Sequence, residues 1–296
     1  MQKTHHGVTA PHALFIGRAT LDVVYSLDQF PAEDTKVFAH AMRAAPGGPA
    51  TNAAITHALL GGRAVLMAPI GGGPWATPVR GELERLGIQV IDLAEGTRYE
   101  IPLSAVLVNE AGATRTIVNP PRSAVDLPTV HVWDAAWGEA PGLALTDGFH
   151  LRETLPLLCE LRALGKQICL DGGSWKPGTE ALAPILSMAV CSEQFAVPGR
   201  SPDGNATIDW FAEMGVPCVA ITRGARAILG WDRGRIFEIE IEKIEAVDTL
   251  GAGDVLHGAL CFHFARAREF EPSLQWASRI ATESCRGAGI QPLRGA

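Results

Sequence analysis

The chain has 296 residues, of which 47% are hydrophobic and 19% are charged, and its formal net charge is −7. This balance is typical of a globular domain with a sizeable core, and it argues against nucleic acid as the main partner, because phosphate backbones require clustered Lys and Arg. No uninterrupted apolar stretch reaches the roughly 20 residues of a membrane span, so we expect no membrane association.

The N-terminal half alternates short apolar runs with helical periodicity. Residues 1–12 lack the apolar core of a secretory signal and are predicted to be a flexible lead. The pattern then predicts buried strands at 13–17, 63–70 and 88–93, and helices at 49–62 and 77–87. Pro49 falls in the first turn of its helix, and Gly87 follows the last turn of the other.

The C-terminal half continues this alternation. A hairpin is predicted over 101–121, with its turn at 110–113. Further strands are expected at 142–148, 166–173, 187–192, 217–224 and 234–247, and helices at 152–165, 252–268 and 273–286. The rhythm predicts an α/β fold whose mostly parallel sheet is flanked by helices. Segments at about 18–46 and 99–122 do not fit these layers, and we expect them to form a small β-sheet lid.

The six cysteines form no C-x-x-C pair, and most lie in apolar stretches. In a chain of this length, that usage favours a reducing cytoplasm over a disulfide framework.

The stretch D-T-L-G-A-G-D, residues 248–254, joins a predicted strand to a long helix. The first N–H groups of a helix lack internal partners and carry partial positive charge, and glycines let an anion approach them closely. Asp254 would lie beside such an anion, where a carboxylate can take a proton from an attacking hydroxyl. An alternative is purely structural, with Asp248 capping the helix and Asp254 as a favourable acid of the first turn.

Two motifs resemble the signatures of the PfkB, or ribokinase-like, carbohydrate kinases. D-T-L-G-A-G-D is similar to the C-terminal signature D-T-x-G-A-G-D, and P-G-G-P-A-T-N-A-A at 46–54 is similar to the N-terminal one. I-T-R-G-A-R-A at 221–227 resembles the nucleotide-site strand and loop. The resemblance spans about residues 13–290 and implies a single kinase domain over 13–296. Its three-layer fold would bind ATP with Mg²⁺ at the sheet edge and a sugar under the lid.

The resemblance also implies a role for individual residues. Asp254 would be the general base, and the backbone of Gly251, Ala252 and Gly253 would form the anion hole. The sugar hydroxyls would be held by Asp22, Gly47, Gly48 and Asn52. The nucleotide site would be lined by Thr222 and Gly224, with Glu193 as the nearby acid. Asp248, with carbonyls near 285–289, would be the place of a monovalent cation such as K⁺.

Some positions depart from the family pattern. Ser192 and Phe195 stand where members of the family often carry Asn and Glu, so metal handling is expected to differ. The predicted lid carries Arg18, Asn109, Arg115 and Arg122. Any of these arginines could pair with an anionic substituent on the sugar or be a solvated charge at the edge of the lid. Arg115 is the preferred candidate because relatives often carry Arg there.

The predicted function is therefore an ATP-dependent kinase acting on ribose, a fructose-like ketose or an acidic sugar derivative. A nucleoside kinase of the same fold and a catalytically silent sugar-binding protein are alternatives. An NAD-dependent oxidoreductase using Gly71–Gly73 and Asp92 is an alternative from another class. His257, three residues after Asp254, could tune the base or be a core residue. The lid is a possible surface for a homodimer.

Overall fold

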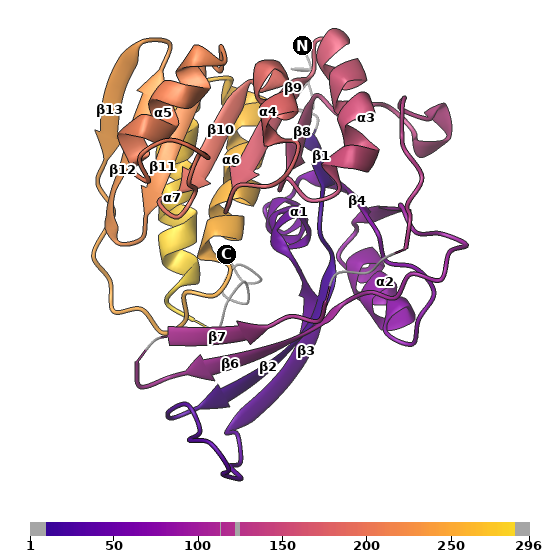
Figure 1. The fold of residues 1–296 in the computed structure, drawn as a ribbon, viewed down its shortest axis with the longest axis vertical. Coiled ribbons are helices and arrows are strands. Elements are labelled where there is room, and N and C mark those ends of the chain that lie inside the picture. Colours follow the sequence, from indigo (N-terminus) through magenta and orange to yellow (C-terminus); the bar gives the residue numbers. More distant parts are fainter. Residues whose placement is uncertain (1–9, 113, 122–124, 288–296) are drawn as a thin grey trace, which may run out of the picture.

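The computed structural model describes residues 10–112, 114–121 and 125–287, and its centre is a nine-stranded sheet (Figure 1). The strand order is β13-β12-β11-β10-β9-β8-β1-β4-β5. The strands are β1 (His12–Ile16), β4 (Arg63–Ala68), β5 (Gln89–Asp92), β8 (Leu143–Thr146), β9 (Gln167–Gly172), β10 (Met188–Ser192), β11 (Cys218–Arg223), β12 (Arg226–Asp232) and β13 (Arg235–Ile239). All neighbours pair in parallel except β11–β12 and β12–β13. The carboxyl ends of the parallel strands therefore meet at one edge.

Helices cover both faces of this sheet, because alternate residues of each central strand point to opposite sides. In β1, Ala13 and Phe15 belong to one apolar core, whereas Leu14 and Ile16 belong to the other. The first core contains α1 (Pro49–Leu59), α2 (Ala76–Arg85), α6 (Ala252–Ala267) and α7 (Phe270–Ser284). The second contains α3 (Leu151–Ala163), α4 (Thr179–Leu182), the 3₁₀ turn Ala183–Ile185 and α5 (Gly204–Glu213). A further 3₁₀ turn spans Ala135–Trp137. The result is the predicted three-layer α/β fold.

A second sheet of four strands lies beneath the carboxyl edge of the large one (Figure 1). We call it the lid; it consists of β2 (Thr20–Leu27), β3 (Ala41–Gly47), β6 (Leu103–Asn109) and β7 (Thr114–Val118), in the order β3-β2-β6-β7. Three residues separate β1 from β2, so the central strand leads almost directly into the lid. Val24, Val106 and Val108 form the inner face of the lid and pack against Leu250.

The element predictions differ from the structure mainly at the sheet edge. The strand predicted over 234–247 is wrong beyond Ile239, where β13 ends. The chain then crosses from the sheet edge to α6, and the N–H groups of Val247 and Asp248 bond to the carbonyl oxygen of Cys285 instead of a strand neighbour. Strand β12 was not predicted, and no bounds were predicted for α5; its N-cap residue is Asp203, whose side chain accepts a hydrogen bond from the N–H of Ala206.

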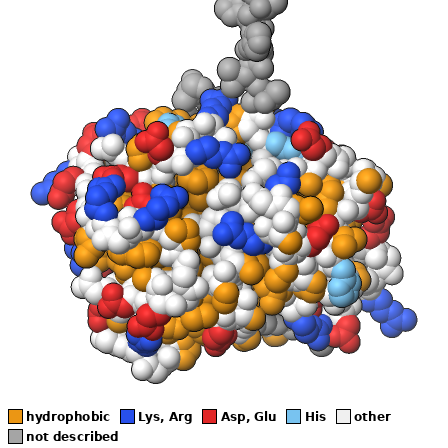
Figure 2. Space-filling view, turned by 90° about the horizontal axis from the view of Figure 1, so that it is seen from above, with side chains coloured by type: hydrophobic (Ala, Val, Ile, Leu, Met, Phe, Trp, Pro, Cys, Tyr) orange, Lys and Arg blue, Asp and Glu red, His pale blue; other side chains and the backbone are white. Residues whose placement is uncertain are grey.

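Charged residues of both signs are scattered over the face drawn in Figure 2, among apolar side chains. Within the described ranges, no helix is both long and apolar enough to cross a membrane.

Candidate active site

The N-terminus of α6 is open toward the lid. Gly251 begins the helix with φ 76°, a left-handed conformation that favours glycine, and no described side chain caps the first turn. A Cβ built on Gly253 would meet no atom within 4 Å. Gly253 is exposed, so an anion can approach the first turn of the helix here, while the N–H of Ala252 donates to the carbonyl oxygen of Thr249 at 3.3 Å.

Asp254 lies in the first turn of α6 and is partly exposed. Its Oδ2 accepts a hydrogen bond of 2.8 Å from Nδ2 of Asn52 on α1. Burial raises the pKa of Asp254 to about 7, and the negative charge of Asp171 adds to the shift. The bond from Asn52 and the nearby His257 act in the opposite direction. The carboxyl is therefore suited to accept a proton near neutral pH.

Asp171, at the end of β9, was not predicted as a site residue. Its side chain is buried, and its Oδ2 has no hydrogen-bond partner among the described residues. His257 Nδ1 lies 3.4 Å from that oxygen and 2.7 Å from the carbonyl oxygen of Gly253, while Nε2 lies 3.0 Å from the carbonyl oxygen of Val190. His257 thus links the first turn of α6 to β9 and β10, next to the predicted base.

Asp147 is a second acid that sequence reasoning missed. It follows β8, and its Oδ2 accepts hydrogen bonds from the N–H groups of Arg18, at 2.9 Å, and Ala50, at 3.2 Å. Burial raises the pKa of Asp147 to about 6. Both missed acids come directly at the end of a buried strand and precede glycine, a position that predicts side chains at the carboxyl edge of a parallel sheet.

The residues predicted to hold sugar hydroxyls lie between the lid and α1. The Oδ1 of Asp22 on β2 accepts a hydrogen bond of 2.7 Å from Thr20, and burial raises the pKa of Asp22. Gly47 approaches the same carboxylate so closely that a Cβ there would lie 2.1 Å from its Oδ2. Gly48 precedes α1 with φ 99° and faces the backbone of Arg18. Asp22, Gly47 and Gly48 therefore meet where β1 enters the lid.

The lid also contacts the D-T-L-G-A-G-D turn. Arg115 on β7 donates from Nη1 to Oγ1 of Thr249 at 3.0 Å. Arg43 on β3 lies 3.4 Å from Oδ2 of Asp248, and Oδ1 of that aspartate accepts from the N–H of Leu250 at 2.8 Å. Asp248 therefore stabilises the turn that precedes α6. The structural alternative placed Asp248 at the N-cap of this helix, but the N-cap residue is Gly251.

The predicted nucleotide residues come together at the ends of β10 and β11. The N–H of Glu193 donates to the carbonyl oxygen of Thr222 at 2.9 Å, and Gly224 lies in the adjacent turn with φ 63°. The carboxylate of Glu193 forms an ion pair with Arg226. Phe195, where relatives often carry Glu, is a buried core residue. No acid therefore stands at that position.

The dinucleotide interpretation is wrong. The carboxylate of Asp92 is occupied by the N–H groups of Ile70, Gly71 and Ala94 and by an ion pair with Arg80. Gly71 packs against the carbonyl oxygen of Tyr99, where a Cβ would lie 2.0 Å away. Gly71 and Gly73 thus accommodate the close passage of Tyr99 and Glu100, and the acid that would bind the ribose is already engaged. Of the other predicted residues, Arg122 and positions 288–289 lie outside the described ranges.

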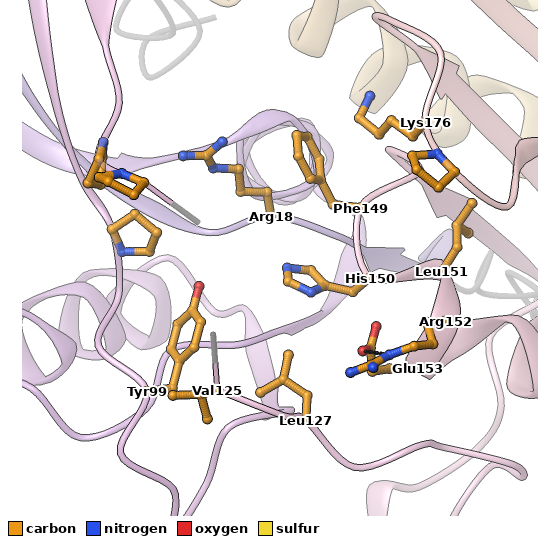
Figure 3. A pocket seen from close by; sticks show the side chains of 15 residues that line it. Arg18, Tyr99, Val125, Leu127, Phe149, His150, Leu151, Arg152, Glu153 and Lys176 are labelled. Atoms are coloured by element: carbon orange, nitrogen blue, oxygen red, sulfur yellow. Dashed lines mark hydrogen bonds and ion pairs between the residues drawn. The ribbon is translucent and has the colours of Figure 1, made fainter. Parts of the chain in front are cut away.

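A cavity of about 270 Å³ opens beside Arg18, between the base of the lid and the N-terminus of α3 (Figure 3). Its lining includes Arg18, Tyr99, Phe149, His150 and Lys176. Of these, only Arg18 was predicted as a candidate to bind an anionic substituent of the substrate. The cavity adjoins the residues predicted to bind the sugar, because the N–H of Arg18 bonds to Asp147 and its carbonyl oxygen accepts from Oγ1 of Thr51 on α1.

A covered sheet edge, a lid and an acid beside a glycine-rich helix N-terminus define a kinase of the ribokinase-like fold. The model of the pfkB family of carbohydrate kinases matches residues 10–155 and 189–294. The chain belongs to this family, and it is a carbohydrate kinase.

The individual relatives have low sequence identity to this chain, but the matches cover nearly the full length of both proteins. The chain is 23% identical to the ketohexokinase of Mus musculus over 295 residues, covering 95% of this chain and 97% of that protein. The solved ribokinase of Giardia lamblia is similar with a TM-score of 0.78 and 16% identity, covering 97% of each chain. The ribokinase of Arabidopsis thaliana, solved with ribose and ATP, gives a TM-score of 0.75 and 15% identity, covering 96% of this chain and 95% of that one. At these identities the solved structures show the fold alone.

Proposed function

We propose that this protein transfers the γ-phosphoryl group of ATP to a hydroxyl of a sugar, with Asp254 as the general base. The observation that carries the proposal is the pairing of an uncapped helix N-terminus with a carboxyl whose pKa is about 7. A base whose pKa lies near the working pH combines a useful ionised fraction with a real affinity for the proton.

The proposed transfer requires only the sugar hydroxyl, ATP and the carboxylate of Asp254 as reacting groups. The sugar hydroxyl oxygen attacks the γ-phosphorus, its proton passes to the carboxylate of Asp254, and the bond to the β–γ bridging oxygen breaks to release ADP. The amides of Gly251, Ala252 and Gly253 would offset the negative charge on the transferring group. Asp22, Gly47, Gly48 and Asn52 would orient the sugar so that one hydroxyl lies beside the base.

The nucleotide would lie along the ends of β10 and β11, against Thr222 and Gly224, with Glu193 nearby. The described residues contain no group of three or more His, Cys, Asp or Glu that could hold a metal ion. Mg²⁺ would arrive with ATP, and when bound it would offset part of the negative charge of the phosphates.

The test is a coupled ADP-release assay over pentoses, ketohexoses, sugar acids and nucleosides. We expect turnover with at least one sugar, and we expect Asp254→Asn to lose at least about 10²-fold in kcat, since positioned general bases contribute about 10²–10⁴-fold. Binding of an ATP analogue should persist in the variant. Arg200→Gln, which removes an exposed ion pair with Glu213, is the control. Near-normal kcat in Asp254→Asn would refute the assignment, and a preference for nucleosides would favour the alternative kinase.

A homodimer formed through the lid is also proposed. The outer face of the lid, opposite Val24, Val106 and Val108, exposes Tyr25, Met42, Leu103 and Val118. Apolar sheet faces of this kind favour association. Light scattering should show a dimer in the parent protein and a monomer in Met42→Glu; a monomeric parent protein would refute this proposal.

A cytoplasmic location is likewise proposed, and the six free cysteines of the structure support it.

A further inference from the structure

The cavity beside Arg18 collects positive charge in an otherwise acidic protein. Among the described lining residues, Arg18, His150, Arg152 and Lys176 are basic, and Glu153 is the single acid. Arg152 pairs with Glu153 at 2.8 Å and with Asp126 at 3.1 Å, so its charge is offset locally. Arg18 and Lys176 are the other two cations of the lining, and the charge of Lys176 also acts on the buried Asp147 behind it, whose pKa it lowers against the effect of burial.

Lys176 is an unusual member of this group, because it is only 8% exposed. Its Nζ donates to the carbonyl oxygen of Ser174 at 3.1 Å and lies 4.6 Å from the centre of the Phe149 ring. An ammonium withdrawn from water is costly, and an anion placed beside it gains more than it would at the surface.

Phe149 holds the two cations at the cavity. The guanidinium carbon of Arg18 lies 5.4 Å from the centre of the ring that Lys176 also contacts, and Figure 3 shows the ring between the two side chains. Cation–π contacts of this kind orient the charges without neutralising them. The Nη2 of Arg18 also donates to Oδ1 of Asn119 at 3.1 Å, a neutral partner.

Arg18 also connects the cavity to the place of the acceptor sugar. Gly48 packs against the carbonyl oxygen of Arg18. The positive charge of Arg18 lowers the pKa of Asp22, whereas burial raises it. Asn52, one turn further along α1, contacts Asp254. A sugar with its reacting hydroxyl at Asp254 and its other hydroxyls at Asp22 would therefore have its far end at Arg18.

We propose that this cavity receives an anionic group on the acceptor, a carboxylate, phosphate or sulfonate, at the end of the sugar away from the hydroxyl that is phosphorylated. The proposal rests on the kinase function proposed above and names its substrate class. It assigns recognition of the anion to Arg18 and Lys176. Arg115, the sequence-based candidate, bonds instead to Thr249 of the D-T-L-G-A-G-D turn. A cavity of about 270 Å³ is large enough for such a group.

The experiment compares acceptors that differ only at the terminal carbon: fructose, fructose 6-phosphate and 6-deoxy-6-sulfofructose, with gluconate-type acids as a second series. The ratio of kcat/KM for the anionic member to that for the neutral member should be about tenfold or more in the parent protein. Lys176→Gln and Arg18→Gln should each reduce this ratio about tenfold, mainly through KM of the acceptor. Arg200→Gln is the matched control, since it removes one positive charge that does not belong to the lining of the cavity.

Binding of the same acceptors, measured by calorimetry without ATP, separates the two proposals. Anion-selective binding that both variants abolish, without ADP release from any acceptor, would support the cavity and refute the kinase function. Turnover with no preference for anions, or a preference that neither variant reduces, would overturn the cavity proposal and leave the kinase intact. A Lys176→Gln variant that raises KM for ATP equally with every acceptor would instead place Lys176 at the nucleotide.

Discussion

Replacing Asn52 with alanine should move the pH dependence of the reaction toward alkaline values. The amide of Asn52 donates to Asp254 at 2.8 Å, and this bond favours the charged form of the carboxyl. Without it, the proton is held more tightly and the pKa of Asp254 rises. Because the base must be ionised to accept the proton of the sugar, activity below the new pKa should fall.

The size of the effect follows from the hydrogen bond. A bond to a charged group is worth about 1.5–3 kcal/mol, and one pKa unit corresponds to about 1.4 kcal/mol, so the pKa should rise by about 1–2 units. From a starting pKa of about 7, the ionised fraction at pH 7 should fall from about one half to between about one tenth and one hundredth. Activity at pH 7 should thus drop by about 5- to 50-fold and recover to within about twofold at pH 9.

The assay is the pH profile of kcat/KM between pH 5.5 and 9.5, measured by ADP release, and kcat is followed separately because Asn52 is also proposed to bind the sugar. Thr51→Val, which removes the neighbouring hydroxyl that bonds to the carbonyl oxygen of Arg18, controls for disturbance of α1. An acid limb that stays in place in Asn52→Ala, or moves to lower pH, would refute the reasoning about this bond.

Three further predictions concern the same site. Asp254→Asn should raise the melting temperature at pH 8 by about 2–6 °C and by less at pH 4.5. The reason is that the folded pKa, about 7 against 3.8 for the ordinary group, makes the ionised acid destabilising as the pH rises; an equal shift at both pH values would contradict this. Gly47→Ala should raise KM for the sugar about tenfold or more but not KM for ATP, because the new Cβ would displace the carboxylate of Asp22; an unchanged KM for the sugar would contradict the contact. Exchanging KCl for choline chloride tests the predicted K⁺ at Asp248. Because Arg43 lies 3.4 Å from this carboxylate and already supplies a positive charge, we expect the rate to change by less than about twofold. Strong activation by K⁺ would show that the ion displaces the guanidinium of Arg43 from Asp248.

The layered fold was predictable because each level of the sequence indicates the same structure. The apolar runs of β1, β4 and β8 are continuous, as expected for strands buried on both faces, and the helices between them carry clear start and stop signals. The prediction was wrong after Ile239 because the alternating charged residues there resemble a strand with one solvent-exposed face. In the structure β13 is the edge strand of the sheet, and the residues that follow it pair with no strand.

The site was predictable where a local motif carries the chemistry, as in the glycine turn before Asp254. It was not predictable where residues from distant segments meet. Asp147 and Asp171 are single aspartates after strands, and only the order of the sheet shows that their charges act on Asp254. The charged cavity likewise assembles Arg18, Tyr99 and Lys176 from three separate connections, and no spacing in the sequence indicates that they share one wall.

The contacts of lid residues Arg43 and Arg115 with Asp248 and Thr249 have a consequence for communication between the two substrates. They tie two strands of the lid, under which we propose that the sugar binds, to the turn that we propose steadies the transferring phosphoryl group. Any displacement of the lid by an incoming sugar would therefore be transmitted to that turn through these two side chains.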